Sequence, residues 1–319
     1  MKKILIFIFC LVLVLSAEVC LADENLFSYR FAKAEEAAEL LLSHRDYYEN
    51  LTQNDLNYRL QKLDGTLEEL EDFITHQTRD FTDREKKLVG DAMKWIADQC
   101  RKNGYTLPAL ETIVFVKTSM YEEYGAAAYT HGNEIYLGEG FLDRSKLSFI
   151  PYFRDSFRKT IAHELFHCLT RSHPDFRKSM YGILSFTVAE EDYAFPQEVR
   201  DIIISNPDVE HHNSYASFEI SGQMTDCTVI LTAKQFENRG EYFVDYMKPC
   251  LVPVDDFNTV YTAEDAANFW DVFGRNTDYV IDPEETLADN FALLFTKGPK
   301  AKYETPEIIA DMDAYLRKH

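Results

Sequence analysis

The sequence predicts an α+β fold in which a few strands are followed by helices that carry polar, chemically reactive side chains. Its 319 residues are 46% hydrophobic and 27% charged, which is typical of a globular protein with a substantial core. Stretches with helical periodicity and runs of β-branched and aromatic residues succeed one another irregularly, without an internal repeat. This order favours an α+β arrangement.

Residues 1–22 are typical of a secretory signal peptide. Two lysines precede an apolar run over residues 4–15, which is shorter than the ~20 residues that span a bilayer. We therefore predict export to the periplasm or the exterior, with cleavage after Ala22. Lipid attachment at Cys20 is the alternative, although residues 17–19 match a lipobox poorly. No later apolar run is long enough to cross a membrane, so the mature chain is expected to have no transmembrane segment.

The net charge of −21 argues against nucleic acid and anionic membranes as partners. Four cysteines follow the expected signal peptide, and an even count in an oxidising compartment permits two disulfides. Cys227 and Cys250 flank an expected hairpin and are the first pair that we predict. The pairing of the full set, which adds Cys100 and Cys168, stays open. Cys168 is expected to be a small core residue on the buried side of a helix.

Residues 23–81 predict a helical N-terminal extension, because charged and apolar residues are mixed there at helical spacing. The extension contains no plausible set of metal ligands and is expected to pack on the rest of the chain. A helical cover or an inhibitory pro-region is the alternative. Thr82 and Glu85 then form a capping box, which opens a helix that ends near residues 103–104. Three predicted strands follow, over residues 112–117, 126–130 and 134–137.

Residues 160–169 contain the pattern HExxH in a helical frame. Positions four apart lie on one face of a helix, so His163 and His167 can present two imidazole nitrogens to one metal ion. Glu164 can reach a water molecule at that metal without ligating the metal itself. The alternative is a pair of core histidines on an ordinary amphipathic helix. A separate apolar stripe lets the helix bury its other side, and it consists of Ile161, Leu165, Cys168 and Leu169.

A catalytic zinc site needs a third protein ligand, which we predict on a helix that starts at Asp282 and Pro283. Glu285 and Asp289 lie four positions apart on a common face of this helix, so both can point at one site. Glu285 would ligate the metal, and Asp289 would accept the free N–H of a ligating histidine and fix its tautomer. A solvated acidic helix start is the alternative.

HExxH followed by ExxxD on a second helix resembles the zinc metallopeptidases of the zincin fold, and among them the glutamate-ligand branch, the gluzincins. The resemblance implies that His163, His167 and Glu285 bind Zn²⁺. It also implies that Glu164 is the general base and that Asp289 stands behind a histidine. These roles rest on two short motifs.

The layout over residues 83–300 supports the resemblance, which makes residues 82–319 a zincin-like catalytic domain. It implies an upper lobe with a small mixed sheet and the HExxH helix, a mostly helical lower lobe, and an active-site cleft between them. In such enzymes an edge strand pairs with extended substrate, and residues 126–137 are our candidate, an ordinary strand being the alternative. The third histidine of the metzincin branch is absent after the motif.

The 118 positions between His167 and Glu285 (285 − 167) exceed the spacing of compact members and imply an insertion at about residues 174–280. Within it we predict a hairpin of strands over 228–233 and 242–247. A partly helical stretch is expected over residues 188–206, and a helix over 261–273 that ends at Gly274.

The expected function is that of an exported zinc metallopeptidase acting on a protein or peptide substrate. Zinc would polarise the scissile carbonyl and lower the pKa of a water molecule from ~15.7 toward ~7. Glu164 would take the proton of that water and pass it to the leaving amine. Tyr279 is the candidate for oxyanion stabilisation, with Tyr242 and His212 in reserve. Two alternatives remain: a zincin that cleaves a cell-wall amide, and a non-enzymatic exported binding module with a structural or vestigial zinc site. The other histidines considered lack metal spacing: His131, His173, His211 and His212.

Overall fold

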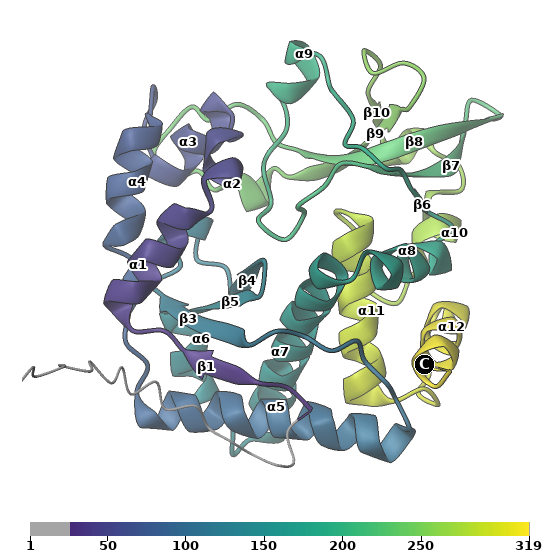
Figure 1. Ribbon diagram of the computed structural model, residues 1–319. Coiled ribbons are helices and arrows are strands. Elements are labelled where there is room, and N and C mark those ends of the chain that lie inside the picture. The colour runs from purple at the N-terminus through teal and green to yellow at the C-terminus, as the bar shows by residue number, and fades with distance from the viewer. Residues whose placement is uncertain (1–25, 319) are drawn as a thin grey trace, which may run out of the picture.

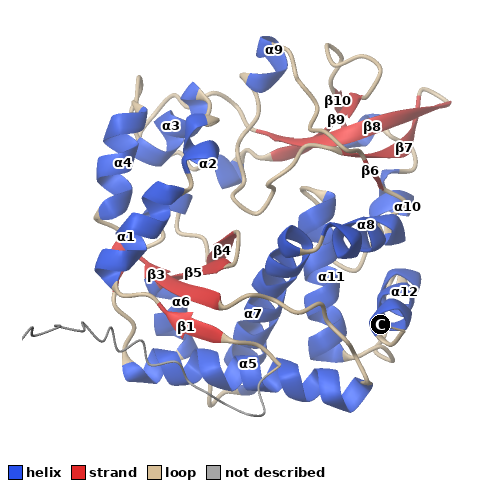
Figure 2. Cartoon of the chain, viewed as in Figure 1, coloured by secondary structure: helices blue, strands red, loops and turns tan. Residues whose placement is uncertain are grey.

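The computed structural model describes residues 26–318, which form an α+β architecture with two β-sheets and many helices (Figures 1 and 2). The α+β class predicted from the sequence is therefore confirmed. The expected signal peptide and Cys20 lie outside the described residues. None of the helices within residues 26–318 combines the length and the apolar character that a bilayer crossing requires.

The first sheet is small and mixed. Its strands lie in the order β1-β3-β5-β4, with β2 pairing on β3. The pairs β1–β3 and β3–β5 are parallel, whereas β4 on β5 and β2 on β3 are antiparallel. Strand β4 is therefore an edge of the sheet, and β5 lies inside it. The strands are β1 (Tyr29–Phe31), β2 (Thr78–Arg79), β3 (Ile113–Thr118), β4 (Ala128–His131) and β5 (Glu134–Gly138).

Both faces of this sheet are covered, because side chains alternate along β3. Ile113 and Phe115 belong to the main core, which also contains apolar residues of α5 (Asp83–Asn103). Val114 and Val116 belong to a second core formed with the N-terminal helices. These helices are α1 (Ala34–Ser43), α2 (Arg45–Glu49), α3 (Gln53–Leu60) and α4 (Leu67–Thr75).

The N-terminal segment is mostly helical, as predicted, but it also contributes β1 and β2 to the first sheet, which the sequence analysis did not anticipate. Helix α5 follows it and agrees closely with its prediction. The Thr82 hydroxyl accepts from the Glu85 backbone N–H and the Glu85 carboxylate accepts from the Thr82 N–H, which completes the capping box. Gly104 ends the helix in the left-handed region, with φ of 70°.

Two helices at the centre of the molecule carry both predicted motifs. Helix α7 (Pro151–Ser172) and helix α11 (Pro283–Lys297) lie side by side, and the rings of Phe166 and Phe291 are 5.4 Å apart at the contact (Figure 1). The main core continues around them. Three further helices flank the pair: α6 (Glu139–Ser145), α8 (Pro174–Ile183) and α12 (Pro306–Leu316).

The second sheet belongs to the predicted insertion and is antiparallel throughout, in the order β10-β9-β8-β7-β6. It lies beyond the first sheet and across the top of α7 and α11 in Figure 2. The short helices α9 (Gln197–Arg200) and α10 (Phe269–Phe273) adjoin it. The strands are β6 (Thr187–Val188), β7 (Ser214–Ile220), β8 (Gln223–Thr232), β9 (Lys248–Pro253) and β10 (Tyr261–Thr262).

Two predictions within the insertion are wrong. The expected strand over 242–247 contains a 3-10 turn (Phe243–Asp245), and β8 pairs instead with β9, directly after it. The expected helix over 261–273 is broken into β10, a 3-10 turn (Ala263–Asp265) and α10, because Ala266 makes an isolated bridge with Ile220. Gly274 does follow the last of these elements, with φ of 72°.

The predicted pairing of Cys227 with Cys250 is also wrong. In the β8–β9 ladder Cys250 lies opposite Ile230, three residues from Cys227. An odd separation along a strand places side chains on opposite faces, so the two thiols belong to different cores. Both are free and buried, as are Cys100 and Cys168, and Cys168 is the core residue that the sequence predicts.

Candidate metal centre

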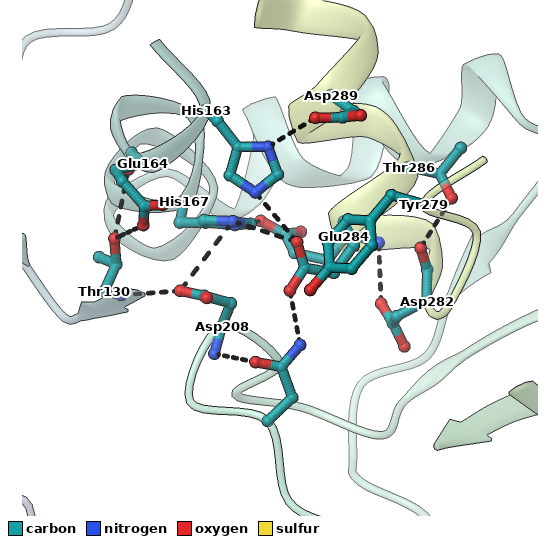
Figure 3. Close-up of polar contacts among 12 residues, drawn as sticks. Thr130, His163, Glu164, His167, Asp208, Tyr279, Asp282, Glu284, Thr286 and Asp289 are labelled. Carbon is teal, nitrogen blue, oxygen red and sulfur yellow. Dashed lines mark hydrogen bonds and ion pairs between the residues drawn. The ribbon is translucent and has the colours of Figure 1, made fainter. Parts of the chain in front are cut away.

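The histidine pair is positioned by helix α7. Pro151 occupies its first turn, where a missing N–H costs nothing, and the predicted apolar stripe is fully buried. This burial fixes the rotation of the helix, so His163 and His167 project together from its other side. Their rings are 4.8 Å apart (Figure 3).

The third predicted ligand is brought to the pair by helix α11. Asp282 caps this helix by accepting the Glu284 backbone N–H at 2.8 Å, as predicted. Glu285 Oε2 lies 3.0 Å from His163 Nε2 and 3.8 Å from His167 Nε2. The structure therefore brings together all three residues that the sequence proposes as ligands, although more than a hundred positions separate them in the chain.

These three donors suit a divalent metal ion. Ligands at ~2.0–2.2 Å from a tetrahedral zinc lie roughly 3.3–3.5 Å from one another, and the two distances to Glu285 bracket that value. His167 Nε2 is buried and makes no hydrogen bond, so it is a donor atom without a protein partner. Two imidazoles and one carboxylate are a set that favours zinc.

Each histidine is held from behind by a carboxylate of α11 (Figure 3). His163 Nδ1 donates to Asp289 Oδ1 at 3.1 Å, as predicted, and His167 Nδ1 donates to Glu284 Oε1 at 3.0 Å. Both Nε2 atoms are thereby turned toward the site. Glu284 is not among the site residues predicted from the sequence, although its place directly beside Glu285, on a helix expected to face both histidines, was an available signal.

Burial and ion pairing act against each other at this centre. Burial lowers the pKa of His163, but its hydrogen bonds to Asp289 and Glu285 outweigh that effect and raise the pKa well above the usual value. A proton on His163 Nε2 thus bridges to Glu285 in the way that a metal ion would. Burial likewise raises the pKa of Asp289, but His163 and Lys159 prevail and hold it below the usual range. Metal binding is therefore expected to release protons.

Glu164 directly follows His163, the first of the predicted ligands, and faces the same space (Figure 3). Its Oε2 accepts a hydrogen bond of 2.8 Å from the hydroxyl of Thr130, on edge strand β4. Burial raises its pKa, and the charges of His163 and His167 only partly oppose this. The arrangement holds a buried carboxylate of increased proton affinity next to the ligand set.

A cavity of about 440 Å³ opens onto this centre and is lined by His163, Glu164 and Glu285. Residues 125–129, at the start of the edge strand, form one wall. The candidate oxyanion donor Tyr279 also lines the cavity, and its ring lies 6.4 Å from that of His163. Five further lining side chains are apolar: Leu231, Phe243, Val244, Met247 and Ile281.

The two reserve candidates for oxyanion stabilisation are placed elsewhere. Tyr242 is half exposed and does not line the cavity, and His212 lies against a different, very small one. The remaining histidines make other contacts, in keeping with their lack of metal spacing. His131 stacks on His44 with 4.4 Å between the rings, His173 bonds to the Ala109 carbonyl and His211 pairs with Asp192.

Two further polar residues reach the centre from the loop between α9 and β7, and no signal in the sequence pointed to them. Asn206 Nδ2 donates to Glu285 Oε1 at 2.5 Å. Asp208 Oδ1 accepts from the Thr130 backbone N–H at 2.7 Å and lies 4.0 Å from His167 Nε2 (Figure 3). Burial raises the pKa of Asp208 to about 8. Loop residues of this kind carry no periodicity, so only the fold reveals them.

Comparison with protein-family models, with curated proteins and with solved structures finds no match for this chain, so its function has to be inferred from its own residues and their geometry.

Proposed function

We propose that this chain is a zinc-dependent metallopeptidase of the gluzincin type, with zinc held by His163, His167 and Glu285. The observation that carries the proposal is the convergence of these three side chains from two helices, with a carboxylate behind each histidine. Zinc bound there would polarise the scissile carbonyl and lower the pKa of a water molecule from about 15.7 toward about 7.

Glu164 is the general base in this proposal. It projects from the same helix as both histidines and lies outside the proposed ligand set of His163, His167 and Glu285, so in this proposal its carboxylate takes the proton. The hydroxyl of Thr130 holds one of its oxygens, which leaves the other for a water molecule and later for the leaving amine. The increased proton affinity of this buried group suits that exchange.

Strand β4 is the proposed binding surface for the backbone of a protein or peptide substrate. It is an edge of the first sheet, and its outward backbone groups adjoin the cavity. The Thr130 N–H points outward, and the two-residue period of a strand turns the backbone groups of Ala128 outward as well. The mostly apolar cavity walls suit an apolar side chain near the scissile bond. Tyr279, at the cavity, is the proposed oxyanion donor.

Export of the enzyme is part of the proposal and is supported by the sequence of residues 1–22 alone. N-terminal sequencing of the protein secreted by its host checks it. A mature chain that begins at Asp23 is the expected result, and an intact Met1 would contradict export by cleavage.

The decisive experiment is Glu164→Gln, which keeps the size of the side chain and removes the proton acceptor. We expect zinc to stay bound in a one-to-one ratio while hydrolysis of casein or of a mixed peptide library falls by about 10²–10⁴-fold. Asp155→Asn is the matched control, because it makes the same chemical change on the exposed side of the same helix.

Two outcomes would contradict the proposal. If the wild-type protein binds no zinc, the proposed metal site is wrong. If hydrolysis is unaffected by Glu164→Gln, the proposed role of Glu164 as general base is wrong. Peptidoglycan tested in parallel separates a cell-wall amidase, which would release cross-link peptides and leave casein intact.

A further inference from the structure

The segment 205–208, between α9 and β7, covers the proposed catalytic centre from the side of the second sheet. Two of its side chains contact groups that the proposed reaction uses. Asn206 donates to the metal ligand Glu285, and Asp208 accepts from the Thr130 backbone N–H. Asp208 is almost fully buried in this position.

The contact with Thr130 uses a position that a substrate needs. Outward N–H groups of an edge strand pair with the carbonyl oxygens of an extended peptide laid along it. Asp208 Oδ1 occupies one such N–H at 2.7 Å, which is a short distance for this kind of hydrogen bond. The carboxylate therefore stands where a substrate carbonyl would bind.

The same carboxylate also lies within the space that the nucleophilic water needs. Donor atoms of Glu164, His167 and Asp208 all lie within 4.8 Å of one another. A water molecule activated by Glu164 has to sit between that residue and the metal held by His167. Asp208 and this water thus compete for one small volume.

The segment also divides the hollow along α7 into two parts. On one side lies the cavity at His163, and on the other lies a second cavity of about 580 Å³, lined by Thr170, Arg171 and Glu284. Asp208 lines both. An extended peptide that crosses the metal must occupy space on both sides of His167, so the segment stands across its path.

Both ends of the segment are tied down. The backbone N–H and the hydroxyl of Ser205 bond to the carboxylate of Asp55, from α3, at 2.9 and 3.0 Å. At the other end Arg171 Nη2, from α7, donates to the Pro207 carbonyl at 2.7 Å. The closed position is therefore specified by the N-terminal helices and by the metal-binding helix together.

We propose that segment 205–208 is a self-inhibitory plug, and that peptide substrates reach the metal centre only when the plug is displaced. This inference rests on the proposed function and adds its regulation. In the closed form Asp208 blocks one backbone site of β4 and the water position, and Asn206 holds Glu285. Displacement frees both sites and joins the two cavities into one cleft.

The test is Asp208→Ala in the full-length, zinc-loaded protein. We expect kcat/KM for an unstructured octapeptide to rise at least tenfold, and acetohydroxamate, a small metal-binding probe, to bind at least tenfold more tightly by calorimetry. Zinc should also be lost faster to dipicolinate. Asp201→Ala, an exposed aspartate just after α9, is the control and should behave as wild type.

Asp208→Asn provides a second test if the alanine variant fails to fold, because it keeps the size and the hydrogen-bond acceptor and loses only the charge. Asp208→Asn should increase the acetohydroxamate affinity and kcat/KM for the octapeptide by less than Asp208→Ala does. Unchanged acetohydroxamate affinity and peptide turnover in a folded, zinc-loaded variant would overturn the plug while leaving the peptidase intact. A fall in turnover with zinc retained would also overturn it, by assigning Asp208 to catalysis. Equal hydrolysis by Glu164→Gln and by the wild type would instead refute the proposed function.

Discussion

The proposed metal centre and the cluster around Arg59 both bury several charged groups, but they resolve the electrostatic cost in different ways. In the Arg59 cluster every charged atom has a partner within the protein. Arg59 bonds to Asp55 and Glu123 at 2.8 Å each, and it also donates to the hydroxyls of Tyr47 and Tyr124 and to the Ser205 carbonyl. Asp55 is further held by Ser205 and by its own helix cap. Such a network pairs its buried charges within the protein and needs no bound ion.

The metal centre is not satisfied in this way. Carboxylates of Glu164, Asp208, Glu284 and Glu285 are buried around two histidines. Arg171 Nη2 lies 4.0 Å from Asp208 Oδ1, and Lys159 pairs with Asp289 behind His163. His167 Nε2 and one oxygen of Glu284 are buried without a hydrogen bond. A satisfied buried network serves the fold, whereas one with surplus negative charge and an unpartnered nitrogen calls for a cation. This contrast supports the proposed metal centre without reference to a motif.

The largest expected effect on stability is at the Arg59 cluster. Arg59→Met removes the cation and leaves Asp55 and Glu123 buried without it, so the free energy of unfolding should fall by about 3–5 kcal/mol. Urea denaturation with circular dichroism measures this. Arg45→Met removes an exposed arginine from its ion pairs and should change stability little. Equal effects of the two substitutions would break the comparison.

Glu122 sharpens the comparison, because it lies beside Glu123 without a cation of its own. Burial raises its pKa from 4.5 to about 7. Below pH 4.5 the Glu122 carboxyl is protonated in both the folded and the unfolded chain, so it does not lower the free energy of unfolding. As the pH rises to 7 the unfolded chain releases this proton first, which lowers the free energy of unfolding by up to about 3 kcal/mol.

Glu122→Gln removes this titration. Relative to wild type, the variant should therefore gain about 2–3 kcal/mol of unfolding free energy between pH 5 and pH 8. Urea titrations of both proteins at the two pH values give the difference. If the difference in unfolding free energy between the variant and the wild type is the same at both pH values, Glu122 is ionised in the folded protein.

The smallest expected effect lies at the metal centre, behind a ligand. Glu284→Gln keeps a hydrogen-bond acceptor for His167 Nδ1 and removes its charge, so zinc affinity should fall by about 10–100-fold. Competition with a chelator of known affinity measures it. Glu307→Gln is the matched control, because Glu307 also follows a first-turn proline, in α12, and is exposed. Equal zinc affinity in both variants would show that Glu284 does not support the ligand.

Local signals explain which parts could be predicted from the sequence. The capping box of α5, the proline starts of α7 and α11 and the spacing of the histidines are all encoded within a few neighbouring residues. The convergence of Glu285 on His163 followed from pairing two such local patterns. Each of these elements forms where its own residues indicate.

The remaining features depend on distant partners. Strand β1 has three residues and exists because β3 lies beside it, more than eighty positions later. The aromatic and β-branched stretch over 242–247 resembles a strand, but the register of β8 selects β9 instead. Asn206 and Asp208 gain their importance only because the second sheet carries their loop over the metal centre.

The placement of β1 limits how far this protein can be shortened. Proteolytic trimming up to residue 82 would strip β1 and β2 from the first sheet, uncover Val114 and Val116, and leave Glu123 buried without its arginine. The loss would also free Ser205 from its anchor on Asp55. We therefore expect a chain that begins after Phe31 to be less stable than the full one, which argues against activation by removal of the whole N-terminal segment.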